Sequence, residues 1–454
     1  MRKIILFASF VLIVHIQLFA QTYQPKHAGK WNEISNYIKA NWSKQRAVSK
    51  DLPFAYITVW PGLPFMFYWD SYFINEGLLM SKLDSFARNN TANLLYAVDK
   101  FGFIGNAVVT DWGMNRSQPP YLSTMVRTIY EQAKVKDAHF LRKAYKTLLK
   151  EYLFWTDTSK NAIENHSTGV AGLQRFFHHA TDEELVILYG ELADRFGFSR
   201  AVSDSEKIKI ATPFAVEAAS GMDFTTRFEH RSPDFISVEL NSLLYLYEIN
   251  FLWMEKILKM PVSKNWLQLA EQRKLLINQY CWDEARGLYL DYDFVQKRRS
   301  KVAAVTAYQP MWAGIASSNQ AKRLVQNLPM LETEWGIATV EKTGEIKNYQ
   351  WGETSVWAPM QLMVVKGLAK YGYTSASKRI AAKYLDLVAN NYLNPNPASY
   401  TEKGAVVNRK KATIYEKYKA DGTINDDEYK ASEMFGWTAG SFLWLHAYYS
   451  KSRK

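Results

Sequence analysis

The sequence predicts an all-α protein in which helical hairpins form a single large toroid. Apolar residues recur at three- and four-residue spacing along most of the chain, as in Leu240, Leu243, Leu244, Tyr247 and Phe251. Strand-like alternation is scarce, and no Pro-, Ser- or Gly-rich linker divides the chain. Helices joined by loops suit one helical domain, and a ring of helix pairs needs no exact repeat.

The helical pattern occurs in segments spread over the whole chain. We expect helices near 31–43, 84–98, 121–133, 138–155, 182–196, 236–257, 263–280, 319–327, 354–370, 374–391 and 437–449. The most distinctive polar motifs lie between these segments. Because the loops of a helical ring gather at its ends, we expect the active site to be formed by loops at one end.

The N-terminus has the pattern of a secretory signal peptide. Arg2 and Lys3 precede an apolar run, and Ala20 is a small residue at which a signal peptidase can cut. We therefore expect residues 1–20 to be the signal peptide and 21–454 the functional domain, in the periplasm or secreted. Polar residues interrupt the apolar run, so it is a poor membrane span, and no stable membrane partner is expected after removal of the signal. An uncleaved anchor is the alternative.

Composition narrows the function. The chain has 454 residues, of which 48% are apolar and 22% charged, as in ordinary globular proteins. Its aromatic content of 15% is high, which fits both core packing and flat platforms for sugar rings. The net charge is +12, but the basic residues are dispersed and no nucleic-acid-binding module occurs, so no nucleic-acid partner is expected. We expect a monomer.

Several chemistries lack their motifs. There is no P-loop, dinucleotide-binding glycine motif, nucleophile elbow or zinc spacing, and His178-His179 is poor geometry for one metal. We expect neither cofactor nor metal. Cys281 is the sole cysteine, so an internal disulfide is impossible, and we expect it to be a buried small residue.

Three motifs combine polar groups with residues that restrict the backbone. Tyr68-Trp69-Asp70-Ser71-Tyr72 places a carboxyl among rings, Arg116-Ser117-Gln118-Pro119-Pro120 places a guanidinium and an amide before a rigid helix start, and Ser220-Gly221-Met222-Asp223 places an acid after a glycine turn. Each motif also has a structural interpretation, as a helix cap or a turn. Their co-occurrence indicates a surface that binds sugar hydroxyls.

Together with further segments, these motifs resemble the trehalase family of glycoside hydrolases, whose fold is a single (α/α)6 barrel. The similarity also includes Val238-Glu239-Leu240-Asn241-Ser242-Leu243-Leu244-Tyr245, Gly287-Leu288-Tyr289-Leu290-Asp291-Tyr292-Asp293, Gln350-Trp351 with Trp357-Ala358-Pro359, Glu416-Lys417-Tyr418 and Phe435-Gly436-Trp437-Thr438. Eight motifs in the family's order imply a shared fold and class.

The resemblance implies roles for particular residues. Asp223 matches the family's general acid and Glu416 its general base, for cleavage of α,α-trehalose with inversion. Positions that match its substrate-binding residues are Trp69, Asp70, Asn106, Arg116, Ser117, Gln118, Gly221, Gln350, Trp351 and Glu428. The spacing from Asn106 to Arg116 is longer here than in the family.

Three departures concern the substrate. The family's Gly-Gly-Arg-Phe stretch is Gly62-Leu63-Pro64-Phe65 here, without the sugar-contacting Arg. Its Arg-Pro-Glu segment has no clear counterpart near His178-His179-Ala180, and its Gln-Trp-Asp is Gln350-Trp351-Gly352, followed by Glu353. Trehalose is therefore the first expectation, another α-glucoside or α-mannoside the second, and an inactive carbohydrate-binding barrel the alternative from another class.

Overall fold

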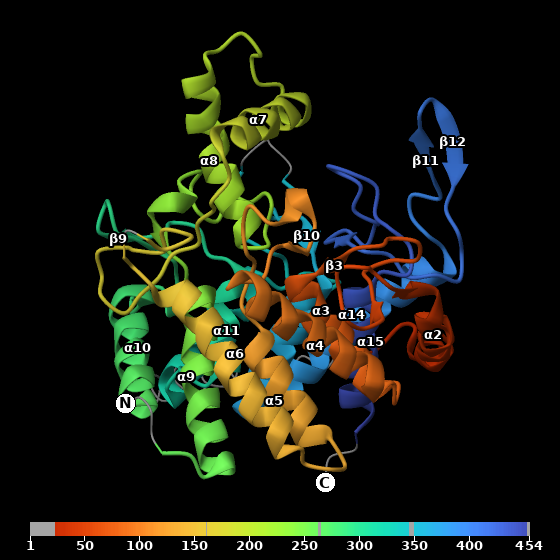
Figure 1. The fold of residues 1–454 in the computed structure, drawn as a ribbon. Helices are drawn as coiled ribbons and strands as arrows, with labels where there is room; N and C mark the ends of the chain where they lie inside the picture. The colour runs from red at the N-terminus through yellow and green to blue at the C-terminus, as the bar shows by residue number, and fades with distance from the viewer. Residues whose placement is uncertain (1–22, 160, 262–264, 345–348, 452–454) are drawn as a thin grey trace, which may run out of the picture.

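In the computed structural model most helices pack side by side in one body, with α7 and α8 above them (Figure 1). The structure describes residues 23–451 except 160, 262–264 and 345–348. Its helices are α2 (Ala28–Asn41), α3 (Tyr68–Met80), α4 (Asp84–Phe101), α5 (Leu122–Gln132), α6 (Ala138–Thr156), α7 (Asp182–Phe196), α8 (Asp204–Ala219), α9 (Val238–Leu258), α10 (Trp266–Cys281), α11 (Gln309–Ala313), α12 (Ser318–Gln326), α13 (Ala358–Lys370), α14 (Thr374–Leu393) and α15 (Gly436–Ser450).

Short 3-10 helices and strands lie in the connections. The 3-10 helices are η1 (Trp42–Gln45), η2 (Asp111–Gly113), η3 (Ser232–Asp234), η4 (Val305–Tyr308) and η5 (Leu328–Met330). The strands are β1 (Arg46–Ala47), β2 (Tyr56–Ile57), β3 (Met66–Phe67), β4 (Ala107–Val108), β5 (Phe235–Ile236), β6 (Trp282–Asp283), β7 (Leu288–Tyr289), β8 (Tyr292–Asp293), β9 (Arg298–Arg299), β10 (Ser355–Val356), β11 (Ser399–Glu402), β12 (Ala405–Asn408) and β13 (Tyr418–Lys419). All pairings between these strands are antiparallel.

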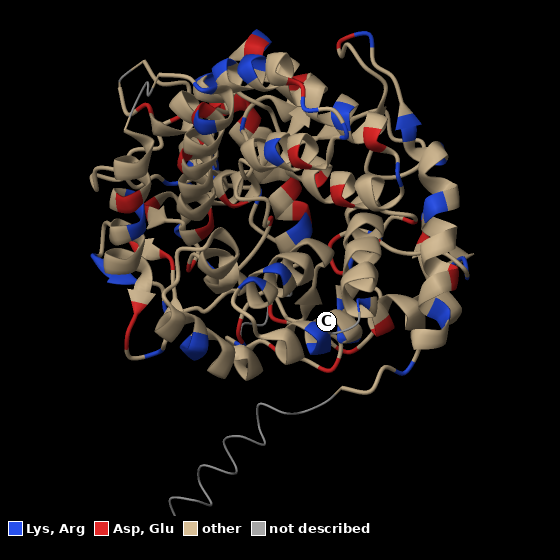
Figure 2. Cartoon of the chain, turned by 90° about the horizontal axis from the view of Figure 1, so that it is seen from below, with Lys and Arg blue, Asp and Glu red and all other residues tan. Residues whose placement is uncertain are grey.

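The inner layer of the ring closes on itself. Each inner helix packs against the next, in the order α3, α5, α9, α11, α13 and α15, and α15 returns to α3. Outside them, α4 packs on α3, α6 and α10 on α9, α14 on α13, and α2 on α14 and α15. The view from below shows this ring, with acidic and basic residues interspersed around it (Figure 2). The predicted all-α toroid is confirmed as an (α/α)6 barrel.

Three observed helices were not predicted: α3, α8 and α11, and α11 has only five residues, too few to show a helical period. The helix α3 is buried on every side from Tyr68 to Leu78, so its sequence lacks the alternation of an amphipathic helix. The helix α8 contains Pro213, a residue that normally ends a helix. It survives here because α8 packs against α7 and η3. Each of the predicted helical segments corresponds to an observed helix.

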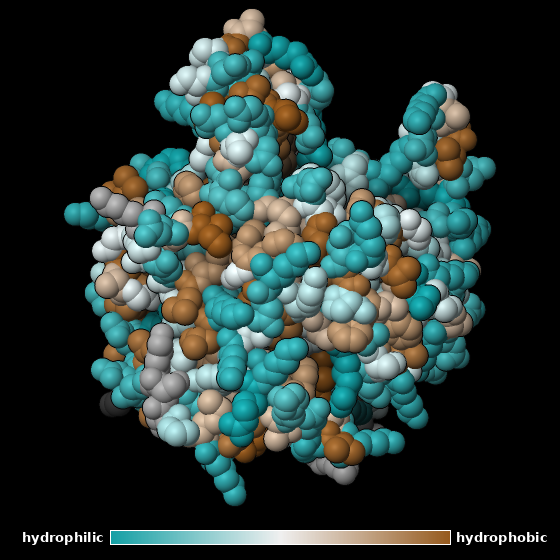
Figure 3. Space-filling view, in the orientation of Figure 1, coloured by the Kyte–Doolittle hydropathy of each residue, from teal (hydrophilic) through white to brown (hydrophobic). Residues whose placement is uncertain are grey.

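The α7–α8 pair is inserted between α6 and α9 and projects from one end of the ring (Figure 1). Thr181 caps α7 in a capping box with Glu184. The pair has its own apolar cluster, which includes Tyr189, Phe214 and Phe224. In the space-filling view the projecting pair exposes apolar as well as polar atoms (Figure 3).

The ends of several inner helices meet at the same end of the ring. The helices α3, α13 and α15 begin directly after short extended segments. Strand β3 pairs with β4, and β10 pairs with β13, so these pairs fix the loops before α3 and α13. The barrel therefore holds residues from distant parts of the sequence on rigid supports.

Among the described residues, no helix is both long and apolar enough to cross a bilayer. The expected signal peptide, 1–20, lies outside the described residues.

We predict that Gly440→Ala strongly destabilises the protein. Gly440 of α15 lies against α3 so closely that an added Cβ would be 1.9 Å from the carbonyl oxygen of Phe73. Separating the helices to admit it should cost about 3 kcal/mol or more. Unfolding in urea measures the change.

Gly190→Ala is the matched control. Gly190 lies within α7, and a Cβ there would meet nothing within 4 Å. The substitution should stabilise the protein by about 0.5–1 kcal/mol, since alanine favours a helix. A Gly440→Ala variant as stable as the wild type would show that α3 and α15 are not in rigid contact.

Candidate active site

A cavity of about 200 Å³ lies at the end of the ring where α3, α13 and α15 begin. It gathers residues from six separate parts of the sequence. The predicted site residues that line it are Trp69, Asp70, Asn106, Arg116, Gln118, Gly221, Asp223, Gln350, Trp351 and Glu416. The two acids, almost two hundred positions apart in sequence, thus face one cavity.

Two predicted residues, Ser117 and Glu428, lie behind the cavity wall. The amide of Ser117 donates to Glu164 Oε1 at 3.3 Å, and the Ser117 side chain is buried. Glu428 accepts hydrogen bonds from Arg195 Nη1 at 3.3 Å and from the amide of Gln350 at 3.2 Å. In this structure both residues hold the wall in place rather than lining the cavity.

Backbone hydrogen bonds tie three of the site segments together. Trp69 and Asp70 lie in the first turn of α3. The amide of Tyr68 donates to the carbonyl of Asn106 at 3.1 Å, and the amide of Asn106 donates to the carbonyl of Arg116 at 3.0 Å. The spacing between Asn106 and Arg116 therefore does not prevent both from reaching the cavity.

The loop that carries Asp223 begins where α8 ends. Gly221 has a φ of +77°, and an added Cβ would lie 3.0 Å from the Trp69 ring. Glycine is required there for its backbone conformation and for the close approach of the ring. Gln350 Nε2 donates to the carbonyl oxygen of Asp223 at 2.5 Å, which fixes the acid's backbone.

The surroundings of Asp223 favour its protonated form. Burial raises the pKa of this carboxyl, and the nearby Arg116 guanidinium opposes the rise. Within the described part of the chain, no other residue donates a hydrogen bond to its carboxylate oxygens. A buried carboxyl without donors is suited to carry a proton to a ligand.

The surroundings of Glu416 differ in their hydrogen bonds. Its Oε1 accepts from the Tyr429 hydroxyl at 2.6 Å, and its Oε2 accepts from the Ser432 amide at 3.1 Å. Burial raises the pKa of Glu416, while Lys417 and these two donors lower it. Hydrogen bonds to both oxygens favour the ionised carboxylate, so Glu416 is the better proton acceptor of the pair.

The main chain of Glu416 is also fixed. Its carbonyl oxygen accepts from Trp437 Nε1 at 2.9 Å and from the Thr438 hydroxyl at 3.1 Å, both at the start of α15. Its amide donates to the carbonyl of Ser432 at 2.9 Å. Glu416 is therefore attached to the rigid barrel.

Asp70 is a third carboxyl in the same cavity. Burial raises its pKa to about 8, and the charges of Glu416 and Asp223 add to the rise. Asp70 is 4% exposed. At neutral pH it is therefore mostly protonated, and its hydroxyl and carbonyl oxygens are suited to exchange hydrogen bonds with a polyol.

Three buried polar atoms of the cavity residues have no hydrogen-bond partner among the described residues. They are Asn106 Oδ1, Arg116 Nε and Gln118 Oε1. Leaving such atoms unpaired costs free energy, so their convergence on one cavity indicates a ligand with several hydroxyl groups.

Aromatic rings supply the apolar part of the wall. Trp351 stacks on Trp357 with ring centroids 4.1 Å apart, and Trp437 packs edge-on against Trp357 at 5.4 Å. All three line the cavity. Flat rings beside hydroxyl-binding groups are complementary to the apolar faces and polar edges of a sugar.

A second cavity, of about 390 Å³, adjoins the first and shares Arg116 and Asp223 with it. The other side of this second cavity is formed by the α7–α8 pair, with Glu184, Glu191 and Arg195 of α7 among its lining residues. Asp223 therefore lies between two spaces.

His178 lines this second cavity, at the place where the family's Arg-Pro-Glu segment is absent. Burial lowers the pKa of His178 to about 4, so at neutral pH the imidazole is uncharged. His179 instead turns to the buried Glu164, which it meets at 2.8 Å. The neighbouring histidines thus have separate surroundings.

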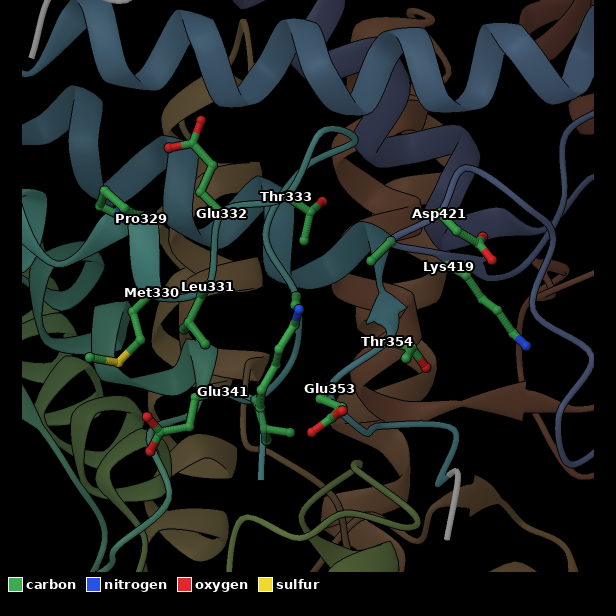
Figure 4. A pocket seen from close by; sticks show the side chains of 14 residues that line it. Pro329, Met330, Leu331, Glu332, Thr333, Glu341, Glu353, Thr354, Lys419 and Asp421 are labelled. Carbon is green, nitrogen blue, oxygen red and sulfur yellow. The ribbon is translucent and has the colours of Figure 1, made fainter. Parts of the chain in front are cut away.

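A larger hollow, of about 900 Å³, has a different character (Figure 4). Its acidic groups already have partners: Glu332 pairs with Arg379, Glu341 with Arg286, and Glu353 accepts from the amide of Thr343 at 2.6 Å. Glu353 points into this hollow (Figure 4) and does not line the first cavity, so it does not replace the acid of the family's Gln-Trp-Asp. Over the described residues, no group of His, Cys, Asp and Glu is arranged to hold a metal ion.

Sequence reasoning missed several residues of the site. Tyr429, next to the predicted Glu428, orients the base, and Trp357 and Trp437 complete the aromatic wall. The cavity residues on α7 could not be predicted, because nothing in their helix distinguishes them from a solvated face. Only the insertion of α7 and α8 over the site reveals them.

A barrel of helices with paired carboxyls in a cavity lined by aromatic side chains has the architecture and site chemistry of a barrel glycoside hydrolase. The sequence profile of the family described as Trehalase matches residues 17–450. The chain belongs to the trehalase family.

Named relatives agree with this membership. The cytosolic neutral trehalase of Kluyveromyces lactis is 30% identical over 434 residues, covering 85% of this chain and 56% of the relative. The periplasmic trehalase of Xanthomonas campestris is 30% identical over 417 residues, covering 87% of this chain and 68% of the relative. The chain thus spans just over half the length of the neutral trehalases that it matches.

Solved structures share the fold. The neutral trehalase Nth1 of Saccharomyces cerevisiae superposes with a TM-score of 0.70 at 23% identity, covering 92% of this chain and 80% of that one. A GH63 mannosylglycerate hydrolase of Thermus thermophilus superposes with a TM-score of 0.61 at 16% identity, covering 90% and 99%. At these identities the likeness extends to the fold alone.

We predict that Asp70→Asn stabilises the protein increasingly as pH rises from 5 to 7. The native pKa of Asp70 is about 8, whereas an unfolded Asp titrates near about 3.9. Between these values the native state keeps a proton that the unfolded state has lost, so the stability of the wild type falls with rising pH. Asparagine does not titrate, so the stability of the variant relative to the wild type should rise by up to about 1.4 kcal/mol per pH unit. Urea unfolding at both pH values measures it.

Asp111→Asn, at an exposed carboxyl of η2, is the control, and its stability relative to the wild type should not rise comparably with pH. A gain for Asp70→Asn that is the same at pH 5 and pH 7 would contradict a protonated Asp70.

Proposed function

We propose that the chain is an inverting glycoside hydrolase that cleaves α,α-trehalose into two glucoses. The observation that carries the proposal is one cavity lined by Asp223, Glu416 and three buried polar atoms without partners. Family membership supports the reaction class. The substrate is proposed because the named relatives are trehalases.

In the proposed reaction the first cavity holds the glucose whose anomeric carbon is attacked. Asp223 gives its proton to the glycosidic oxygen as the bond to the anomeric carbon breaks. Glu416 takes a proton from a water molecule, whose oxygen bonds to that carbon from the opposite face. For this geometry the two carboxyls should lie about 6.5–9.5 Å apart, with the water between.

The remaining groups bind and orient the sugar. Asn106, Arg116 and Gln118 offer the atoms that need partners, and protonated Asp70 can donate to a ring hydroxyl. The stacked side chains of Trp351 and Trp357 pack behind the sugar ring and exclude water. Hydrogen bonds that strengthen as the sugar flattens would contribute most to the rate.

A second candidate is cleavage of another α-glucoside or an α-mannoside. It is favoured by the absence of the family's Arg near Gly62 and by the uncharged His178 in the second cavity. An inactive sugar-binding barrel remains the candidate from another class, and the retained acid and base argue against it.

We predict that trehalose gives α- and β-glucose in equal initial amounts, because inversion makes one β-glucose while the leaving glucose remains α. Proton NMR of early products, with kojibiose, nigerose, maltose and mannosylglycerate run in parallel, identifies the substrate. Asp223→Asn and Glu416→Gln should each lower kcat by at least about 10²–10⁴-fold. Glu353→Gln, in the other hollow, is the matched control and should keep activity.

Only α-glucose from trehalose would exclude inversion. Product from a different sugar alone would support the second candidate. Sugar binding without any product would identify the inactive barrel.

We also propose that residues 1–20 are removed during export and that 21–454 acts as a monomer in the periplasm or outside the cell. The signal-like start of the chain and the periplasmic relative support this location, although other relatives are cytosolic. Fractionation of the producing cells, followed by N-terminal sequencing, should give an exported protein that starts at Gln21. An intact chain confined to the cytosol would contradict it.

A further inference from the structure

The two cavities on either side of Asp223 differ in size. The first has about 200 Å³ and the second about 390 Å³, although α,α-trehalose would place one glucose in each. A second space about twice as large as the first can hold more than one sugar ring. The surplus lies on the leaving-group side, since the first cavity holds Glu416.

Trp112 of η2 lines the second cavity and is 49% exposed. Phe65 packs edge-on against its ring at 5.8 Å, and Phe67 is tilted against it at 6.0 Å. These contacts hold an indole at the cavity while leaving half of its surface in solvent. Exposed rings fixed at the wall of a sugar site are suited to stack on a sugar face.

The helix α7 contributes a matching set of groups to the same cavity. Glu184, Ile187, Leu188 and Glu191 recur at helical spacing and so share one face. Ile187 is 66% exposed. No hydrogen bond joins the Glu191 carboxylate to another described residue, so it can accept one from a hydroxyl. Apolar and acceptor groups beside an indole fit a neutral sugar.

We propose that Trp112 and this face of α7 form a further subsite for a neutral sugar, beyond the one that takes the leaving glucose. The chain then hydrolyses α-glucosides whose leaving group is a disaccharide. This inference rests on the proposed function, because it extends the leaving-group side of the same site. The first cavity, of about 200 Å³, still admits one glucose.

The probe is a trisaccharide made of α,α-trehalose with another α-glucose on the 4-hydroxyl of one ring. Water is added across the trehalose bond, with the unsubstituted glucose in the first cavity. The early products are therefore β-glucose and α-maltose, which NMR distinguishes. We expect kcat/KM within about tenfold of that for trehalose. Release of β-maltose, or a value more than a hundredfold lower, would overturn the subsite.

Variants test Trp112 directly. Trp112→Ala should lower the ratio of kcat/KM for the trisaccharide to that for trehalose about tenfold, and Trp112→Phe should restore most of it because a ring remains. Leu275→Ser, at an exposed apolar residue of α10 that does not line the cavity, is the control and should leave the ratio unchanged. An unchanged ratio in Trp112→Ala would also overturn the subsite.

The two proposals fail in different ways. If trehalose is cleaved and the trisaccharide is not, the subsite is wrong and the hydrolase stands. If neither is cleaved, the hydrolase proposal fails, and calorimetry of the trisaccharide with the wild type and Trp112→Ala decides the subsite. Equal affinities for the two proteins would overturn it, and weaker binding by the variant would support it.

Discussion

The proposed function depends on keeping two carboxyl groups of one cavity, Asp223 and Glu416, in different protonation states. Burial raises the pKa of both Asp223 and Glu416, so burial alone does not distinguish them. The difference lies in the donors: Tyr429 and Ser432 hydrogen-bond to the oxygens of Glu416. The rise in the pKa of Asp223 is opposed mainly by the nearby charge of Arg116 and further by the charges of Arg195 and Lys417. When the pKa values of two acids differ in this way, one site can supply both a proton donor and a proton acceptor at the same pH.

The barrel makes this arrangement rigid. Close packing of α3 on α15 fixes the ends that carry Trp69, Asp70 and Trp437, and backbone hydrogen bonds join the loops of Tyr68, Asn106 and Arg116 to one another. The site has an electrostatic free-energy cost, because three carboxyl groups share one buried space. A large helical core can tolerate that cost, because Asp70 lies in the first turn of the buried helix α3, and the loops that carry Asp223 and Glu416 rest on helices of the barrel. The α7–α8 insertion then completes the leaving-group side.

Much of this was predictable from the sequence, and the exceptions have physical reasons. The amphipathic helices were identified from their local pattern, whereas the roles of Asp223 and Glu416 were inferred from the resemblance of several motifs to the trehalase family. The helix α3 was not, because a helix buried on all sides has no polar face, and α8 was hidden by Pro213. Ser117 and Glu428 were assigned to the cavity, but their hydrogen bonds place them behind its wall. The contribution of α7 depends on where a whole helix pair lies, which no local pattern reveals.

The central claim is that Asp223 donates a proton and Glu416 activates water, and α-glucosyl fluoride tests it most directly. Fluoride leaves without a proton, so this substrate needs the base but not the acid. We expect Asp223→Asn to hydrolyse it within about tenfold of the wild type, and Glu416→Gln to be slower by at least about a hundredfold. Equal losses in the two variants, or a greater loss in Asp223→Asn, would contradict the assignment of the two roles.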